Sequence, residues 1–310
     1  MAALTWDDLG KKIYETGVDR GVLYIPNAGG VYDNGVAWNG LTAVTESPSG
    51  AAATSQYADN TKYMNLISAE EFAATLEAYT YPDEFAQYDG LSLPTTGVAV
   101  GQQARKTFGL SYRTKVGNDV SGDAFGYKIH LLYGCQASPS EKAYKTVNDS
   151  PEGISFSWSL STNPVNVSGL KPTALITIDS TKVVAANLTA FEIILYGTTG
   201  VSPALPMPDA VVSAFSSGLT AVSTITPPSY VNSTHIMTIP TVTGVDFFIT
   251  KMTGTTITTA QALAVSGAQT ALAAGQSWII NARAKTGYYL AAGNIDEWKI
   301  DYASADRAAS

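Results

Sequence analysis

The chain has 310 residues, of which 45% are apolar and only 14% are charged, and its formal net charge is −8. Its length fits one large or two ordinary domains, whose cores need no disulfide or metal for stability. Residues 1–206 carry −7 of the net charge, which disfavours tight binding to nucleic-acid phosphates. The low charge content favours β-structure with a surface of Ser, Thr, Asn and Gly.

The cysteine content and the N-terminus define the expected compartment. Cys135 is the only cysteine, so the sequence has no disulfide framework and no thiolate cluster for zinc or iron–sulfur. We expect a buried, inert thiol. Asp7 and Asp8 stand where a signal peptide needs apolar residues, and no later apolar stretch reaches the ~18 residues of a membrane span. The sequence therefore predicts folding in a reducing cytoplasm, with no membrane partner.

The N-terminal segment, residues 1–20, mixes charges with apolar side chains that need a partner, among them Trp6, Ile13 and Tyr14. We expect an arm that becomes ordered on assembly, and a frayed tail is the alternative. From residue 21 the pattern changes to strands.

Alternation of apolar and polar residues predicts the strands of the first domain. Residues 155–161 alternate serine with a large apolar residue, and this period of two is that of a half-buried strand. Residues 108–112 and 125–135 alternate in the same way, and further strands are expected within residues 22–44. We expect these strands to form one antiparallel core.

Two segments break the strand pattern. Residues 82–88 begin with proline and two acids, which is typical of a helix start. Residues 185–196 place Leu188, Phe191 and Leu195 at helical spacing before Gly197. This pattern predicts a helix of about three turns that ends at the glycine and packs against the sheet.

Loops and breakers divide the chain. Residues 46–59 are rich in Ser, Gly and Ala and predict a long loop, whereas residues 201–209 contain three prolines and predict a short linker. Short strands at sandwich spacing follow, so we expect an immunoglobulin-like β-sandwich without a cysteine pair. We therefore predict a mainly β protein. An antiparallel β-sandwich or barrel with a flanking α-helix and an N-terminal arm (1–200) precedes the linker and an immunoglobulin-like domain (210–310).

We find no constellation of residues suited to catalysis, to a cofactor or to a metal. His130 and His235 fall in different predicted domains and are interpreted as structural. Residues 97–107 contain Gly, Lys and Thr without the spacing of a phosphate loop. Residues 117–123 offer oxygens to calcium but lack the EF-hand pattern, so a hairpin tip is the better interpretation. An enzyme would need an active site of acids and tyrosines that their spacing does not reveal.

Several motifs together resemble one protein family. They are residues 57–63 (Tyr-Ala-Asp-Asn-Thr-Lys-Tyr), residues 68–85, residues 126–134 (Gly-Tyr-Lys-Ile-His-Leu-Leu-Tyr-Gly), and residues 178–180 (Ile-Asp-Ser) before the helix that ends at Leu195-Tyr196-Gly197. In order and spacing they resemble the major tail tube proteins of long-tailed, siphovirus-type bacteriophages, over most of residues 18–200. Residues 285–298 are similar to the immunoglobulin-like modules often appended to phage virion proteins.

The resemblance implies a structural virion protein. Its subunits would close into hexameric rings by pairing their sheets, and the rings would stack into the tail tube. The implied partners are further copies of the chain, the tape measure protein, the tail terminator and tail-tip proteins, and genomic DNA that passes through the lumen without specific binding. Assembly would take place in the host cytoplasm and the product would be the virion tail. An acidic first half fits a lumen that repels phosphate.

Breaks in the strand pattern mark candidate inter-subunit contacts within this resemblance, namely the arm, the loop at 46–59 and the helix at 185–196. The predicted contact residues are Trp6, Ile13, Tyr14, Ser47, Ser49 and Tyr57. The C-terminal domain is expected to project outward, to decorate the tail and to be dispensable for the tube.

The main alternative is a bacterial surface or carbohydrate-binding β-sandwich protein. Exposed aromatic side chains such as Tyr288 and Tyr289 would stack on sugars in that case. The lack of an export signal in the sequence counts against it.

Overall fold

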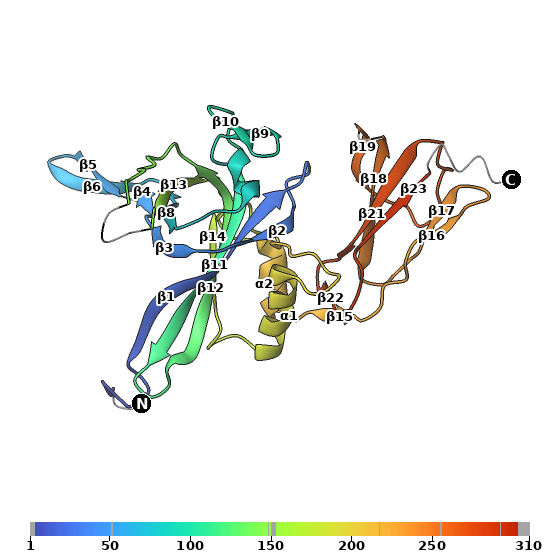
Figure 1. Ribbon diagram of the computed structural model, residues 1–310. Helices are drawn as coiled ribbons and strands as arrows, with labels where there is room; N and C mark the ends of the chain where they lie inside the picture. Colours follow the sequence, from blue (N-terminus) through green and yellow to red (C-terminus); the bar gives the residue numbers. More distant parts are fainter. Residues whose placement is uncertain are drawn as a thin grey trace. The chain divides into compact units, whose positions relative to one another are not determined.

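The structure is a computed structural model that describes residues 4–50, 52–147, 149, 153–216, 218–254, 256–291 and 293–302. The chain forms two compact units. The first consists of the residues up to Ile25 together with Val36–Lys182, and the second of Pro26–Gly35 together with the residues from Val183 onward. Strands dominate both units, as the composition predicts (Figure 1).

The predicted domain borders (1–200, 201–209 and 210–310) stay a prediction, and their outer ends at residues 1–3 and 303–310 lie outside the described residues. The helix that begins at Ala185 belongs to the second compact unit, with the C-terminal part of the chain.

An eight-stranded sheet organises the first unit. Its strands follow in the order β2-β1-β11-β12-β13-β8-β3, and β14 pairs with β12. Their bounds are β1 Ile13–Pro26, β2 Tyr32–Trp38, β3 Leu41–Glu46, β8 Ala73–Ala78, β11 Phe108–Asn118, β12 Gly122–Ala137, β13 Phe156–Thr162 and β14 Leu175–Asp179. The strands predicted at 108–112, 125–135 and 155–161 are thereby confirmed, and so is the hairpin tip at 117–123.

Aromatic side chains fill the core of the first unit. Phe85 lies in a short 3-10 helix, η1 (Asp83–Gln87), where Pro82 and the two acids predicted a helix start. Its ring centroid lies 4.5 Å from that of Trp38 and 5.2 Å from that of Trp158. The serines of β13 point to the other side and are exposed, because successive side chains of a strand alternate between its faces.

Cys135 is buried in the same core, as predicted. Burial raises the pKa of its thiol to about 12, because a buried thiolate would lose its hydration. The thiol is therefore protonated and unreactive in the folded protein.

Three two-stranded ribbons leave the main sheet. β4 (Ser49–Gly50) pairs with β7 (Glu70–Glu71), β5 (Ala53–Ala58) pairs with β6 (Thr61–Ile67), and β9 (Ser92–Thr95) pairs with β10 (Val98–Val100). The prediction of a long loop at 46–59 was therefore wrong. Asp59 and Asn60 both have positive φ, as the tight turn between two hairpin strands requires, and β6 supplies the partner strand.

The N-terminal arm predicted at residues 1–20 is also shorter than expected. Ile13 pairs with Asn118 and Tyr14 with Gly117, so both residues belong to the sheet through β1. Among the described residues, only 4–12 precede the first strand. Strand pairing overrides the mixed sequence pattern here, since the partner strand β11 lies about a hundred residues away in the chain and leaves no local signal.

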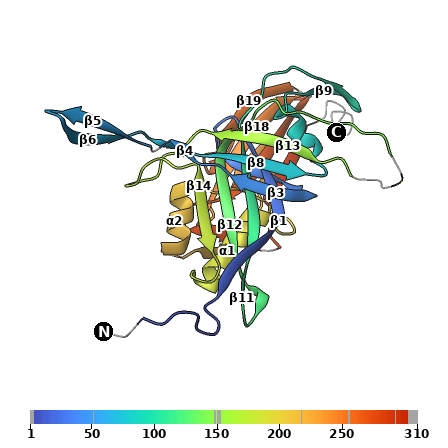
Figure 2. The ribbon, with the colours of Figure 1, turned by 90° about the vertical axis from the view of Figure 1, so that its left-hand side faces the viewer.

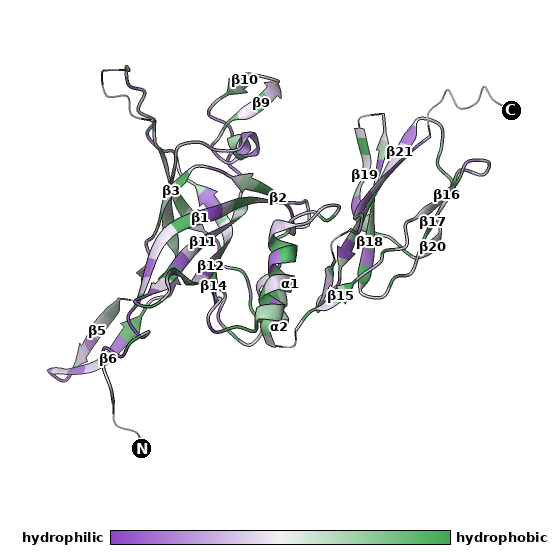
Figure 3. Cartoon of the chain, turned by 60° about the horizontal axis from the view of Figure 1, so that its bottom comes forward, coloured by the Kyte–Doolittle hydropathy of each residue, from purple (hydrophilic) through white to green (hydrophobic). Residues whose placement is uncertain are grey.

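Two helices belong to the second unit. α1 (Ala185–Tyr196) has the predicted bounds, and Gly197 ends it with φ of 71° while its N–H donates to the Ile193 carbonyl. α2 (Pro208–Ser216) was not predicted, because it begins with a proline within the segment interpreted as a linker. Both helices are largely apolar (Figure 3) and pack through Phe191 and Phe215, whose ring centroids lie 5.2 Å apart.

The C-terminal part of the second unit is a β-sandwich, as predicted. One sheet has the order β19-β18-β21-β23 and the other β16-β17-β20, and β15 pairs parallel with β22. The bounds are β15 Thr220–Val222, β16 Ser229–Val231, β17 Ile236–Ile239, β18 Val245–Thr253, β19 Thr256–Leu263, β20 Gly267–Ala268, β21 Gln276–Ala284, β22 Tyr288–Leu290 and β23 Glu297–Asp301. Met237, Phe247, Trp278 and Ile280 lie in the core that the sheets enclose.

Candidate assembly surfaces

The longest ribbon of the first unit carries exposed apolar side chains. We call residues 47–72 the arm; this segment is separate from the N-terminal arm that was predicted at residues 1–20. β4 and β7 form its root, and β5 and β6 form a hairpin that projects away from the eight-stranded sheet (Figures 1 and 2). Every residue of β6 is exposed, although this strand contains several large apolar residues. The exposed large side chains of the hairpin are Tyr57, Tyr63, Met64, Leu66 and Ile67.

The exposure of the arm is unusual for a strand pair of this composition. Tyr57 is 72% exposed and Tyr63 69% exposed. A two-stranded hairpin without a covering layer is marginally stable in water, because its backbone bonds are solvated and it buries little apolar surface. The arm therefore carries apolar surface that the described part of the chain leaves exposed.

The root of the arm is fixed to the sheet by hydrogen bonds. The Ser47 N–H donates to the Ala73 carbonyl at 2.8 Å, and the Thr162 hydroxyl donates to the Phe72 carbonyl at 2.6 Å. The Phe72 side chain is half-buried against the aromatic core. Hydrogen bonds therefore attach the base of the arm to the sheet, while its β5–β6 hairpin extends beyond the sheet.

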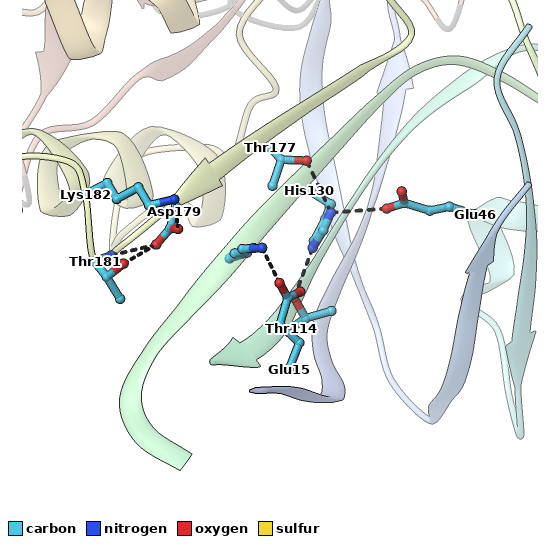
Figure 4. A network of polar contacts seen from close by, with 9 residues as sticks. Glu15, Glu46, Thr114, His130, Thr177, Asp179, Thr181 and Lys182 are labelled. Atoms are coloured by element: carbon cyan, nitrogen blue, oxygen red, sulfur yellow. Dashed lines mark hydrogen bonds and ion pairs between the residues drawn. The ribbon is translucent and has the colours of Figure 1, made fainter. Parts of the chain in front are cut away.

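A polar network adjoins this root (Figure 4). Glu46, the last residue of β3, accepts a hydrogen bond from the Tyr112 hydroxyl at 2.5 Å, and its Oε1 lies 3.2 Å from Nδ1 of His130. Nε2 of His130 lies 3.0 Å from the Thr114 hydroxyl, and Thr177 completes the group. A neutral ring with its proton on Nδ1 donates to Glu46 and accepts from Thr114, so it satisfies both contacts.

Burial lowers the pKa of His130 and outweighs the nearby Glu46 carboxylate, which acts in the opposite direction. The ring stacks on Tyr112, with centroids 4.7 Å apart and planes inclined by 7°. Burial and the bond to Glu46 raise the pKa of the Tyr112 hydroxyl, which stays a donor. These contacts hold His130 and Glu46 in place, and they fix the strand end from which the arm starts. That His130 is structural stays a prediction.

The N-terminal segment is attached to the tip of the β11–β12 hairpin. The Gly10 N–H donates to Oδ1 of Asp119 at 2.9 Å, and the Asn118 side-chain amide donates to the Gly10 carbonyl at 3.3 Å. Beyond this anchor, Trp6 is 76% exposed, and Leu4 and Leu9 are exposed as well. These apolar side chains have no cover within the described part of the chain.

The six predicted contact residues fall in different surroundings. Trp6 and Tyr57 are strongly exposed, and Ile13 and Tyr14 are exposed at the start of β1. Ser47 and Ser49 lie exposed at the root of the arm. The structure thus brings three of them, Ser47, Ser49 and Tyr57, onto one element. That they contact another subunit stays a prediction.

Sequence reasoning missed two sets of residues. Tyr63, Leu66 and Ile67 form the apolar part of β6, and their signal was an apolar strand directly after the Asp-Asn turn. The β9–β10 ribbon exposes a second set, whose members are Leu93, Val98 and Val100. Each ribbon lies outside the main sheet, so apolar side chains on it have no core to enter.

Ion pairs neutralise much of the ribbon formed by β1, β11 and β12. Arg113 donates to both carboxylate oxygens of Asp19, at 2.7 and 2.6 Å, and this bond lowers the pKa of Asp19. Lys128 pairs with Glu15, and Lys115 with Asp123. Asp19, Glu15 and Asp123 of this ribbon are therefore each paired with a cation.

Within the described ranges, no three His, Cys, Asp or Glu side chains are grouped so that they could hold a metal ion. None of the helices among those residues has the length and apolar character of a membrane-crossing helix.

Comparison with known proteins gives little guidance. No protein-family model and no curated protein matches the chain. Among solved structures, it is similar to a chain described as part of the cryo-EM structure of the anti-feeding prophage baseplate, six-fold symmetrised, with 8% identity and a TM-score of 0.29. The match covers 58% of this chain and 100% of the other. A TM-score this low carries no argument about fold or function.

Proposed function

We propose that the chain is a structural subunit that polymerises, as stacked hexameric rings, into the tail tube of a long-tailed bacteriophage. The observation that carries the proposal is the arm, which projects from a hydrogen-bonded root and exposes every residue of β6, four of them large and apolar. The resemblance of residues 18–200 to tail tube proteins gives that surface its partner, another copy of the chain.

The physical argument is one of burial. Covering apolar surface stabilises an assembly by roughly 25 cal/mol per Å². Such a surface would remain exposed in a lone subunit, whereas in a ring or a stack of rings each copy covers its neighbour. The low content of charged residues, 14%, supports the same conclusion, since charges are depleted at the centres of subunit interfaces.

The partners follow from this role. The tube would assemble around a tape measure protein, end at a tail terminator and join tail-tip proteins, and its lumen would conduct DNA without specific binding. We also propose that the chain acts without catalysis, in the host cytoplasm during assembly and in the virion tail afterwards.

The carbohydrate-binding alternative was based on Tyr288 and Tyr289. Both lie on β22, which pairs with β15, and both side chains are half-buried, so they offer less ring surface to a sugar than the strongly exposed tyrosines of the arm.

Electron microscopy of the concentrated, purified protein tests the proposal. Hollow tubes or six-fold rings are expected for the natural chain, and their loss is expected for the Leu66→Ser, Ile67→Ser double variant. An Ile257→Ser variant, which changes an exposed residue of β19 in the C-terminal sandwich and outside the predicted contact segments, is the matched control. A protein that stays monomeric even with an added tail-tip complex would contradict the proposal.

A chain shortened to end near Val201 does not directly test whether the C-terminal domain is dispensable for the tube. A chain ending near Val201 would lose Phe215, which packs on Phe191 of α1, and Leu205, whose N–H donates to the Tyr32 carbonyl. Failure of such a chain to form tubes would report misfolding of the second unit. Whether the C-terminal domain projects outward and is dispensable stays a prediction.

A further inference from the structure

The turn between β1 and β2 is built to hold one carboxylate in place. We call residues 26–35, which belong to the second unit, the tip. Oδ1 of Asn27 accepts the N–H groups of Gly29 and Val31 at 2.8 and 3.1 Å, and the Asn27 N–H donates to the Val31 carbonyl. Nδ2 of Asn27 donates to Oδ2 of Asp33 at 3.0 Å. The tip is therefore preorganised, with Asp33 fixed on its side.

The C-terminal sandwich meets this carboxylate with an arginine. Arg283 of β21 forms an ion pair with Asp33 and donates to Oε1 of Gln261 on β19. Its guanidinium also lies over the Phe248 ring, 4.5 Å from the centroid. The Arg283 and Asp33 side chains are 20% and 22% exposed, so the pair is mostly shielded from water.

A cavity of about 240 Å³ lies beside the pair, within the second unit. One wall comes from the tip, from α1 and α2 and from residues 201–207, with Phe191, Leu205 and Met207 among its side chains. The other wall comes from β21, β22 and the turn between them. The cavity is partly open to solvent, so its apolar walls face each other without interdigitating as the side chains of a core do.

The two walls are thus joined at the edge of the cavity by polar groups. Besides the ion pair, Asn27 reaches Gln261 at 3.5 Å, and the Ser202 N–H donates to Oδ2 of Asp296 at 2.8 Å. Burial lowers the pKa of Arg283, which reflects the cost of removing its charge from water. Shielded ion pairs add little net stability, but loss of one partner leaves the other unpaired and favours opening.

We propose that the Asp33–Arg283 pair is a latch that holds the C-terminal sandwich against the tip, and that its release uncovers the apolar cavity walls for a neighbouring copy during assembly. The latch itself is a property of the single chain. Only its use in assembly rests on the proposed function.

Hydrogen exchange of the full-length monomer, at a concentration too low for assembly, tests the latch. Asp33→Asn or Arg283→Gln should speed amide exchange in residues 202–214 and 281–290 by roughly tenfold, while exchange in β11 and β12 stays unchanged. The charge-swapped double variant Asp33→Arg, Arg283→Asp should restore most of the protection. Lys299→Gln is the matched control, because this lysine lies on the same sheet, outside the cavity, and is 57% exposed.

Two exchange results would overturn the latch. One is unchanged exchange in both single variants. The other is a charge-swapped protein that exchanges as fast as the single variants, since a restored ion pair should close a latch but would not repair a misfolded tip.

The role in assembly is tested separately by light scattering and electron microscopy. If release precedes assembly, Asp33→Asn should form tubes at a several-fold lower protein concentration than the natural chain, and the charge-swapped variant should not. Faster exchange without any change in that concentration would leave the latch standing and overturn its use in assembly. Absence of tubes from every variant, with the tail-tip complex present, would count against the proposed function and not against the exchange result.

Discussion

β13 and β6 are strands of equal length with opposite surroundings. β13 alternates, and its Trp158 is completely buried against Phe85, whereas β6 exposes every residue, including Tyr63 and Leu66. β13 lies inside the eight-stranded sheet, whereas β5 is the one strand that pairs with β6 among the residues that the structure describes. The comparison teaches that strand-forming residues determine that a strand forms, while the position in the topology determines whether the chain itself covers it.

The largest effect is expected in the core that β13 enters. Trp158→Ala should lower the free energy of unfolding by about 3–5 kcal/mol, because the variant leaves a cavity among four other aromatic rings that do not collapse into it. Urea denaturation of the monomer measures the change. Trp6→Ala, which removes an exposed indole, is the control and should change stability by less than about 0.5 kcal/mol. Similar losses of stability for both variants would mean that the buried core around β13 and the exposed N-terminal segment contribute equally to stability.

The next largest effect on stability is expected at Asp89, which binds Lys142 in the connection between β12 and β13. Its buried carboxylate binds Lys142, accepts from the Trp158 indole at 3.2 Å and lies 3.6 Å from Arg105. Asp89→Asn should cost about 3 kcal/mol, since two cations then lose their shielded anion. The measurement is again denaturation, with the exposed Asp83→Asn as control. A cost under about 1 kcal/mol would show that the pairs behave like surface ion pairs.

A smaller effect is expected from the titration of His130. Burial lowers its pKa in the folded chain, so on acidification the unfolded chain binds a proton first, near pH 6.5, and stability should fall as the pH decreases below that value. Denaturation at several pH values measures the slope. His130→Gln should flatten it. A slope that persists in His130→Gln would assign it to another group.

The smallest effect on stability is expected in the arm. The Leu66→Ser, Ile67→Ser double variant should change the free energy of unfolding by less than about 0.5 kcal/mol, because neither side chain has a core to leave. Denaturation of the monomer and tube formation by the same preparation are measured together. Loss of stability in step with loss of tubes would contradict the contrast between β6 and β13.

Local patterns allowed much of the fold to be predicted. The serine alternation gave β13, and the apolar spacing before Gly197 gave α1 with both of its ends. The β5–β6 hairpin of the arm at residues 47–72 was not predicted. Ser, Gly and Ala dominate the sequence up to and into β5, and pairing with β6 outweighs their preference for loops. α2 was not predicted because prolines at a helix start and in a linker look alike.

The candidate contact surfaces were predicted less completely. Trp6 and Tyr57 were found as aromatic residues in segments without strand periodicity. Exposure itself could not be predicted, because it depends on which strands join the main sheet. Tyr63 and Leu66 were for that reason assigned to no surface, and the Asp33–Arg283 pair joins residues 250 positions apart that no local pattern connects.

The burial of Cys135 also makes the protein convenient to label. Its thiol is fully buried and its pKa is about 12, so a thiol-specific dye will not react with the native chain. A cysteine introduced on the arm or at residue 6 would then carry the dye alone, without removal of the natural one. The same thiol becomes reactive when the core of the first unit opens, so its rate of modification reports directly how often that core unfolds.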